Sequence, residues 1–208
     1  MAKQSKKVLT IGCEGFKFKV QKDKTGNSGE LKDLTSLQEV GLEIEAEQGK
    51  VFADNETFEV LNSGVTGATV TGTFVDLTAE ERAELLGVEN KNGMRIYSKD
   101  TIPPYVSVSW KLRCSDGTFM HYGVTYGTFG IPSSSASTME DGAPEQQNAQ
   151  ELEGNFIPRK NGEDKAVYAE MWSGEKDFKE SEFLKFIHGE DIEVEEGTEE
   201  EKEPVPEG

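Results

Sequence analysis

Three glutamates, Glu43, Glu45 and Glu47, occupy alternate positions of the segment Val40–Glu47 and have the spacing that most clearly suggests a function. Apolar residues stand between them, and this period of two is typical of a strand with one buried face. Carboxylates at i, i+2 and i+4 lie about 7 Å apart, inside the Debye length of ~10 Å, so they repel one another. Two interpretations remain open at this point: a solvent face that happens to be rich in glutamate, or a surface that repels polyanions.

Residue types that usually carry catalysis or bind metals form no recognisable pattern. His121 and His188 lie far apart in the chain, and neither a phosphate-binding glycine loop nor a nucleophile elbow is present. The polar segment Lys22–Leu37 does not satisfy the calcium-loop pattern. We therefore expect no enzyme activity, no cofactor and no metal site. Cys13 and Cys114 could form one disulfide, but nothing in the sequence requires it, and free buried thiols are expected.

The formal net charge of the 208 residues is −18, and half of it falls in residues 189–208, which hold ten acidic residues and one lysine. We expect that acidic tail to be disordered. Without a basic stripe, binding to nucleic acid by counterion release is a poor expectation, as is binding to an anionic membrane.

No apolar run approaches the ~20 residues of a membrane span, and the N-terminus lacks the apolar core of a secretory signal. The chain is therefore expected to be made in the cytoplasm and to be soluble there.

Hydrophobic periodicity predicts mostly strands. The expected strands are Phe16–Val20, Val40–Glu47, Lys50–Ala53, Thr57–Leu61, Val65–Leu77, Tyr105–Cys114, Thr118–Phe129, and segments near Gln150–Pro158 and Lys165–Trp172. Turns are predicted at Gln48–Gly49, at Asp54–Asn55 and at Ser115–Gly117. We expect Lys22–Leu37 to be a loop without secondary structure.

Two helices are predicted. Thr78–Glu81 matches a capping box, and Gly87 is a plausible residue to end that helix. A shorter helix is expected at Asp177–Ile187. The fold class that follows is mainly β, a β-sandwich or open barrel with one or two flanking α-helices, in a single domain of residues 1–188. Flexible loops are expected at about 22–37 and 132–148, and the disordered acidic tail follows.

From Glu39 to Arg159, the order of these features resembles the major tail proteins (tail tube proteins) of long-tailed, non-contractile phages, in particular the phi13-type family. The resemblance is collinear and depends on no single motif. The matching stretches are Val51–Glu56, Asp76–Gly87, Ile102–Tyr105, Asp116–Phe129 and Leu152–Phe156.

The resemblance implies a structural virion protein of a siphovirus tail, made in the host cytoplasm. Its subunits would form hexameric rings that stack into a tube, with tape-measure and tail-terminator proteins as further partners. Hairpins of neighbouring subunits would join into one inner β-barrel, through which double-stranded DNA passes during genome ejection without sequence-specific binding. We expect the strands Val40–Ala53 and Val106–Phe129 to supply these hairpins.

Simple geometry agrees with such a conduit. Four strands from each of six subunits give about twenty-four strands, and at ~4.8 Å spacing and ~40° tilt the backbone diameter is roughly 48 Å. Side chains reduce this to a bore somewhat wider than a DNA duplex. A basic wall would hold the duplex, whereas a wall that carries Glu43, Glu45 and Glu47 would let it slide.

Other residues are expected to contact neighbouring subunits or rings. These are Lys6, Lys7, Asp23, Lys24, Asn27, Lys111 and Arg113. Lys111 and Arg113 lie on the polar face of their strand, where they could pair instead with glutamates across strands or subunits. A competing hypothesis is a monomeric β-sandwich that serves as a binding or adhesion module. Tyr122, Tyr126 and Phe129 could be its aromatic surface, but only Tyr122 and Tyr126 share a face, and core packing explains those two at least as well.

Overall fold

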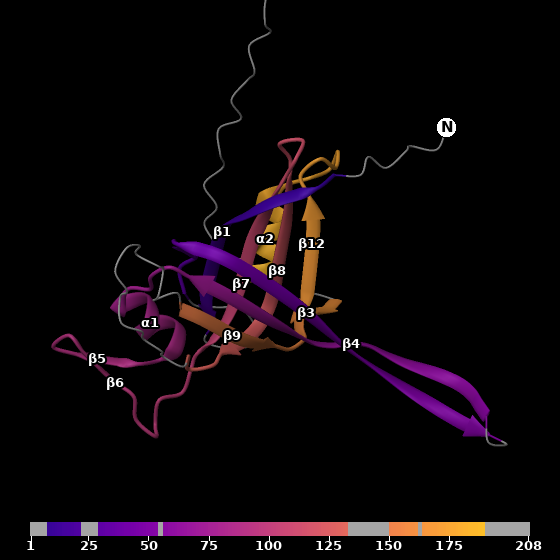
Figure 1. Ribbon diagram of the computed structural model, residues 1–208, viewed down its shortest axis with the longest axis horizontal. Coiled ribbons are helices and arrows are strands. Elements are labelled where there is room, and N and C mark those ends of the chain that lie inside the picture. The colour runs from indigo at the N-terminus through magenta and orange to yellow at the C-terminus, as the bar shows by residue number, and fades with distance from the viewer. Residues whose placement is uncertain (1–7, 22–28, 54–55, 133–149, 162–163, 190–208) are drawn as a thin grey trace, which may run out of the picture.

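The computed structural model describes residues 8–21, 29–53, 56–132, 150–161 and 164–189, and for residues 48, 51–53, 56–57, 59–63, 161 and 164 it describes the backbone alone. Twelve strands and two helices are present in these residues (Figure 1). The strands are β1 (Thr10–Gln21), β2 (Lys32–Leu34), β3 (Leu37–Ala53), β4 (Glu56–Phe74), β5 (Glu89–Lys91), β6 (Met94–Ile96), β7 (Tyr105–Cys114), β8 (Phe119–Phe129), β9 (Gln150–Phe156), β10 (Arg159–Asn161), β11 (Asp164–Ala166) and β12 (Tyr168–Trp172). The helices are α1 (Ala79–Leu86) and α2 (Glu180–His188).

One antiparallel sheet organises the molecule, with the strand order β2-β1-β7-β8-β9-β4-β3 and with β12 also paired to β8. The sheet curls so that its two halves face each other. Phe16 of β1 and Phe74 of β4 are not on neighbouring strands, yet their ring centroids are only 5.1 Å apart. The architecture is therefore an open barrel or sandwich with two helices, which confirms the predicted fold class.

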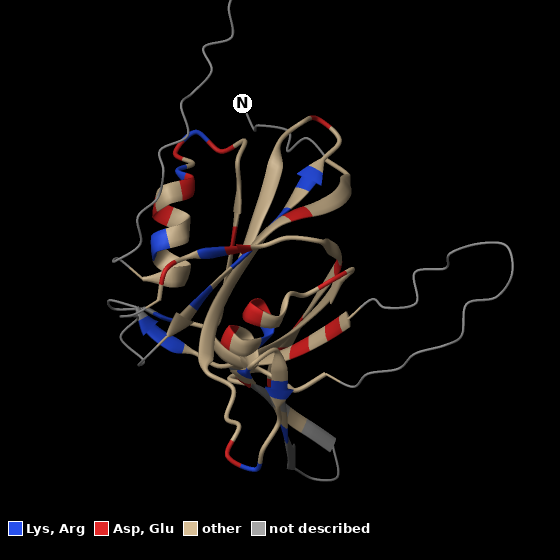
Figure 2. Cartoon of the chain, turned by 90° about the vertical axis from the view of Figure 1, so that its left-hand side faces the viewer, with Lys and Arg blue, Asp and Glu red and all other residues tan. Residues whose placement is uncertain are grey.

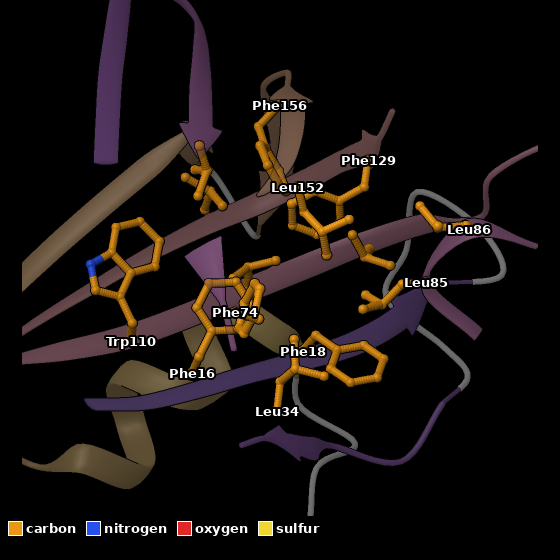
Figure 3. Packing of buried hydrophobic residues seen from close by; sticks show 14 of the residues in the cluster. Phe16, Phe18, Leu34, Phe74, Leu85, Leu86, Trp110, Phe129, Leu152 and Phe156 are labelled. Carbon is orange, nitrogen blue, oxygen red and sulfur yellow. The ribbon is translucent and has the colours of Figure 1, made fainter. Parts of the chain in front are cut away.

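A single large apolar core fills the space between the two halves (Figure 3). Phe16, Phe18 and Trp110 come from one half, while Phe74 and Leu152 come from the other. Each of these side chains is at most 3% exposed. Burial of a side chain of this size contributes about 1.5–3 kcal/mol, so the core holds the two halves together.

Helix α1 closes one end of this core, as the sequence predicts. Thr78 accepts a hydrogen bond from the Glu81 amide, and the Glu81 carboxylate accepts one from the Thr78 amide, so the capping box is complete. Gly87 ends the helix at φ 65°, a left-handed conformation that favours glycine. The side chains of Leu85 and Leu86 are fully buried.

The predicted turn at Gln48–Gly49 is wrong. Gln48 pairs with Asn62 and Gly49 with Leu61 inside one continuous 17-residue strand, and the ladder ends where Ala53 pairs with Glu56. Two-residue hairpin turns favour Asn-Gly or Asp-Gly, whereas Gln-Gly lacks a first residue that tolerates positive φ. With a 19-residue partner strand available, the backbone stays extended and takes up the mismatch as register shifts on either side of Ala46.

Two further predictions need correction. The strands expected at Thr57–Leu61 and Val65–Leu77 form one strand, β4, because pairing with β3 carries the backbone through the intervening polar residues. The segment Lys22–Leu37 was expected to be a loop, but it contains β2, which pairs with Phe16–Phe18 of β1. The long hairpin β7–β8 is present as predicted, with Gly117 at φ 83° in its turn.

Candidate functional site: an acidic sheet face and a projecting arm

The outward face of β3, β4 and β9 carries the glutamate row. Glu43 lies opposite Thr69, which lies opposite Asn155, and all three side chains are on the face away from the core. Thr69 Oγ1 is 3.2 Å from Glu45 Oε1 and 3.1 Å from Asn155 Oδ1. Glu43, Glu45 and Glu47 are all exposed. The structure therefore places the predicted row on one strand face that is open to solvent.

Three more carboxylates share this face, and the sequence analysis missed them. Glu39 lies opposite Thr73, which lies opposite Glu151, and Thr71 lies opposite Glu153. All three glutamates are exposed. The apolar alternation of Gln150–Phe156 was a signal that Glu151 and Glu153 point outward, but only the pairing of β4 with β9 puts them beside the β3 row.

Negative charge dominates this surface, which we call the acidic face. It comprises the outward positions of residues 39–47, 67–73 and 151–155. Its charged residues are Glu39, Glu43, Glu45, Glu47, Glu151 and Glu153. These three segments contain no lysine or arginine, and the lysines and arginines of the described residues are on other segments (Figure 2). A threonine row on β4 separates the two rows of carboxylates, so the face is hydrophilic throughout and repels polyanions.

Beyond the body, β3 and β4 continue as a two-stranded arm (residues 46–53 and 56–65) that projects away from the rest of the chain (Figure 1). The pairing of β4 with β9 stops at Ala68, and within the described residues no further strand pairs with the outer edge of β3. Eight residues of strand extend roughly 26 Å. Phe58 on this arm is 74% exposed, and Val65 is 50% exposed.

An isolated two-stranded ribbon is only marginally stable in water, and its open edges invite pairing with another chain. The arm also exposes the apolar side chains of Phe58 and Val65 to solvent in the monomer. The arm is therefore a candidate contact surface for another chain.

Helix α2 covers part of the outer face of the hairpin β7–β8, and the expected contribution of Val106–Phe129 to a bore stays a prediction. Ser107 and Ser109 are buried at the outward positions of β7, and α2 lies over them. Lys111 makes the expected contact across strands: its Nζ is 3.6 Å from the Glu14 carboxylate and 4.7 Å from the Phe119 ring centroid. Arg113 is exposed near the end of the strand.

Aromatic residues proposed for an adhesion surface belong to packed stacks. Tyr126 is 3% exposed and stacks on Tyr105 with centroids 4.3 Å apart, and Phe129 is 1% exposed. Tyr122 lies between Trp110 and Tyr168, at centroid distances of 5.9 and 6.2 Å. These residues therefore offer no open aromatic platform, and the core packing that the sequence allowed for Tyr122 and Tyr126 is confirmed.

The other residues that the sequence analysis named are His121, the two cysteines and the expected contact residues, and the structure describes only some of them. His121 is 5% exposed and packs against Phe178 and Phe183, as expected of a packed histidine. Cys13 and Cys114 are free thiols. Five predicted contact residues lie outside the described residues: Lys6, Lys7, Asp23, Lys24 and Asn27. The loop 132–148 and the acidic tail lie almost wholly outside them too.

Within the described ranges, no three His, Cys, Asp or Glu side chains gather as a metal site. No helix in that part of the chain is long and apolar enough to cross a membrane.

No protein-family model and no curated protein matches the sequence. Among solved structures, the chain is similar to one from an extracellular contractile injection system, the PVC sheath-tube complex in its extended state, with 12% identity and a TM-score of 0.41 over 76% of this chain and 88% of that one. A similarity this distant carries no argument about function.

Proposed function

We propose that this chain is a structural, non-catalytic subunit of a phage tail tube, which forms hexameric rings that stack into a conduit for DNA. The observation that carries the proposal is the combination of the acidic face with the arm that continues from the same two strands. A surface that repels DNA and an element that needs a neighbouring chain are the two properties that a tube subunit requires.

Support for the bore comes from the position of the carboxylates. They lie on one side of a continuous sheet made of β3, β4, β9 and the end of β8, which pairs with β9 from Gly127 to Phe129. These are four adjacent strands, the number that gives a bore wider than a duplex in a ring of six. The other half of the barrel, covered by α2, then faces the outside of the tube.

Support for ring formation comes from the edges of the sheet. β2 and β3 stand at its two ends, and the arm extends the β3 edge well past the body. A neighbour that pairs with this edge removes an exposed strand edge and buries apolar side chains such as Phe58. Because the two surfaces that meet are different, the contact is heterologous and generates a closed ring or a helix.

The collinear resemblance to phi13-type major tail proteins supports the finer assignment to a siphovirus tail, with tape-measure and tail-terminator proteins as partners in the virion. In this role the DNA is cargo, and the wall has no sequence preference. The alternative of a monomeric adhesion module loses its main support because the aromatic residues it relied on are packed in stacks.

Electron microscopy of the concentrated full-length protein tests the proposal. Rings with six-fold symmetry or stacked tubes are expected. A protein that stays monomeric at all concentrations, also in the presence of a tail-terminator protein, would contradict it. As a control for assembly through the arm, Phe58→Glu is expected to remain a folded monomer under the same conditions.

A further inference from the structure

Phe58 is an exposed aromatic residue near the tip of the arm. The register of the β3–β4 ladder shifts between the pairs Val51–Glu59 and Phe52–Thr57, so Phe58 has no residue opposite it, as in a β-bulge. Bulges bend a strand and redirect a side chain. Because Phe58 is 74% exposed, the arm presents an aromatic side chain to solvent close to its outer end.

A pocket with apolar walls lies between β1, β2 and α1. Its volume is about 360 Å³, and Phe18, Val20 and Pro104 supply its apolar surface. A cavity of ~150 Å³ is enough to hold a benzene molecule. This pocket therefore has room for the side chain of a phenylalanine.

The arm and this pocket lie on opposite sides of the molecule. Figure 1 shows the arm projecting from one end of the long axis, whereas α1 and the β5–β6 hairpin stand at the other end. The body of the barrel separates them, so Phe58 can reach such a pocket only in another copy of the chain. Each copy then offers one anchor and one pocket, which is a head-to-tail contact.

Electrostatic charge also differs between the two ends. Residues 46–65, which include the arm, contain four acidic residues and one lysine. At the α1 end, Arg95 and Lys99 are exposed and make no ion pair with any residue that the structure describes. Opposite charges on two surfaces favour their encounter in the correct orientation.

The charged residues at the pocket itself add no such attraction. Lys32 lies between two carboxylates: its Nζ is 2.5 Å from Glu84 Oε1, and the charge of Glu30 also acts on it. The apolar surface is therefore what would hold a side chain in the pocket, while the basic residues beside it attract the arm.

A second cavity, beside α2, fits the Phe58 side chain less well. Its volume is about 210 Å³, and Lys17, Asp33, Lys111 and Glu180 are among the residues that line it. A phenyl group there would displace water from charged groups without replacing its hydrogen bonds, which is unfavourable.

We propose that Phe58 of one subunit inserts into the pocket between β1, β2 and α1 of the next subunit. This inference rests on the proposed function, because it names the two surfaces that meet around the ring. A few aromatic residues buried in pockets carry most of the binding energy of many interfaces, and Phe58 has this role here.

Photo-cross-linking of the full-length protein tests the contact. The residue p-azidophenylalanine, close to phenylalanine in size, replaces Phe58, and assembled protein is irradiated, digested and analysed by mass spectrometry. Cross-links are expected between different chains, to peptides that contain Val20, Lys32 or Pro104. The matched control carries the same probe at Val65, about 24 Å further down the arm, and is expected to give at least tenfold fewer of these cross-links.

The outcomes separate this inference from the proposed function. If oligomers form but position 58 cross-links to another surface of the neighbour, or to none, the inference is overturned and the ring stands. If the chain forms no oligomer at all, the ring and this inference are overturned together.

A pair of complementary substitutions tests the same contact without a probe. Val20→Phe fills the pocket and Phe58→Ala shortens the anchor, and each alone is expected to raise the concentration needed for assembly at least tenfold in analytical ultracentrifugation. In one chain the two are expected to raise it by much less than the product of the single factors, because residues in contact are not additive. The full product would overturn the inference. If Val20→Phe lowers the melting temperature of the monomer, Glu84→Trp takes its place.

Discussion

Charge reversal at Glu43, Glu45 and Glu47 changes the proposed bore from repulsive to attractive for DNA. Four steps along β3 separate the first from the last of these positions, which is roughly 14 Å at ~3.4 Å per residue. Over that length a duplex carries about eight negative charges, at one per ~1.7 Å. In a hexameric ring the triple lysine variant presents about eighteen ammonium groups where there were carboxylates, enough to neutralise all of those phosphates.

The expected size of the effect follows from counterion release. Contact with about eight phosphates gives a slope near −7 for log K against log salt concentration, so affinity falls about 10⁴-fold between 50 and 200 mM salt. Assembled tubes of the triple variant are incubated with a short fluorescent duplex, treated with nuclease and pelleted. At 50 mM salt they are expected to retain a nuclease-protected duplex and to release it at 200 mM. Wild-type tubes are expected to retain none at either concentration.

A matched control separates the bore from the rest of the surface. Glu80, Glu89 and Glu175 are exposed and lie outside the acidic face, on α1, on β5 and ahead of α2. The variant E80K/E89K/E175K carries the same charge change, and any duplex it binds is expected to stay accessible to nuclease. Tubes of the Glu43, Glu45 and Glu47 variant that protect no duplex, or control tubes that protect as much, would refute the placement of the acidic face in the bore.

Four other outcomes are expected. Leu152→Ala, which empties a position 1% exposed in the main core, is expected to lower the free energy of unfolding by about 2–5 kcal/mol in urea titrations. Thr78→Ala removes the acceptor for the Glu81 amide and should cost about 1 kcal/mol by the same measurement, with tube assembly unchanged. Phe58→Glu should leave the melting temperature of the monomer unchanged and prevent assembly, as judged by sedimentation, because its side chain is 74% exposed in the monomer. The folded-state pKa of His188, about 3, is below its ordinary 6.5, so between these pH values the unfolded chain binds a proton that the folded chain does not. The free energy of unfolding therefore falls as pH falls from 6.5 toward 3, by up to about 1.4 kcal/mol per pH unit. His188→Gln should reduce this dependence of the free energy of unfolding on pH.

Local sequence signals predicted the elements whose geometry is decided locally. The capping box at Thr78–Glu81 and the short turn at Ser115–Gly117 satisfy backbone groups within a few residues of themselves, so their outcome does not depend on the rest of the fold. The glutamate row was predicted for the same reason, since alternation along one strand fixes which side chains share a face.

Features that depend on distant partners were missed. Gln48–Gly49 has the composition of a turn, but the pairing of β3 with a long β4 keeps it extended. Two carboxylates of the acidic face, Glu151 and Glu153, are there only because β9, about eighty residues away in sequence from β4, pairs with it. No local signal indicated that α2 covers Ser107 and Ser109 on the outer face of β7, where the His188 ring nitrogens lie within hydrogen-bonding distance of both hydroxyls. In each case a nonlocal contact overrides the local pattern.

The most direct test of the central claim is a cryo-electron microscopy map of the assembled wild-type filament, at a resolution that traces β3, β4 and β9. The account predicts a hollow tube with Glu43, Glu45 and Glu47 on its inner wall, Glu39, Glu151 and Glu153 beside them, and α2 on the outside. A filament with α2 toward the bore and these glutamates on its outer surface would contradict it.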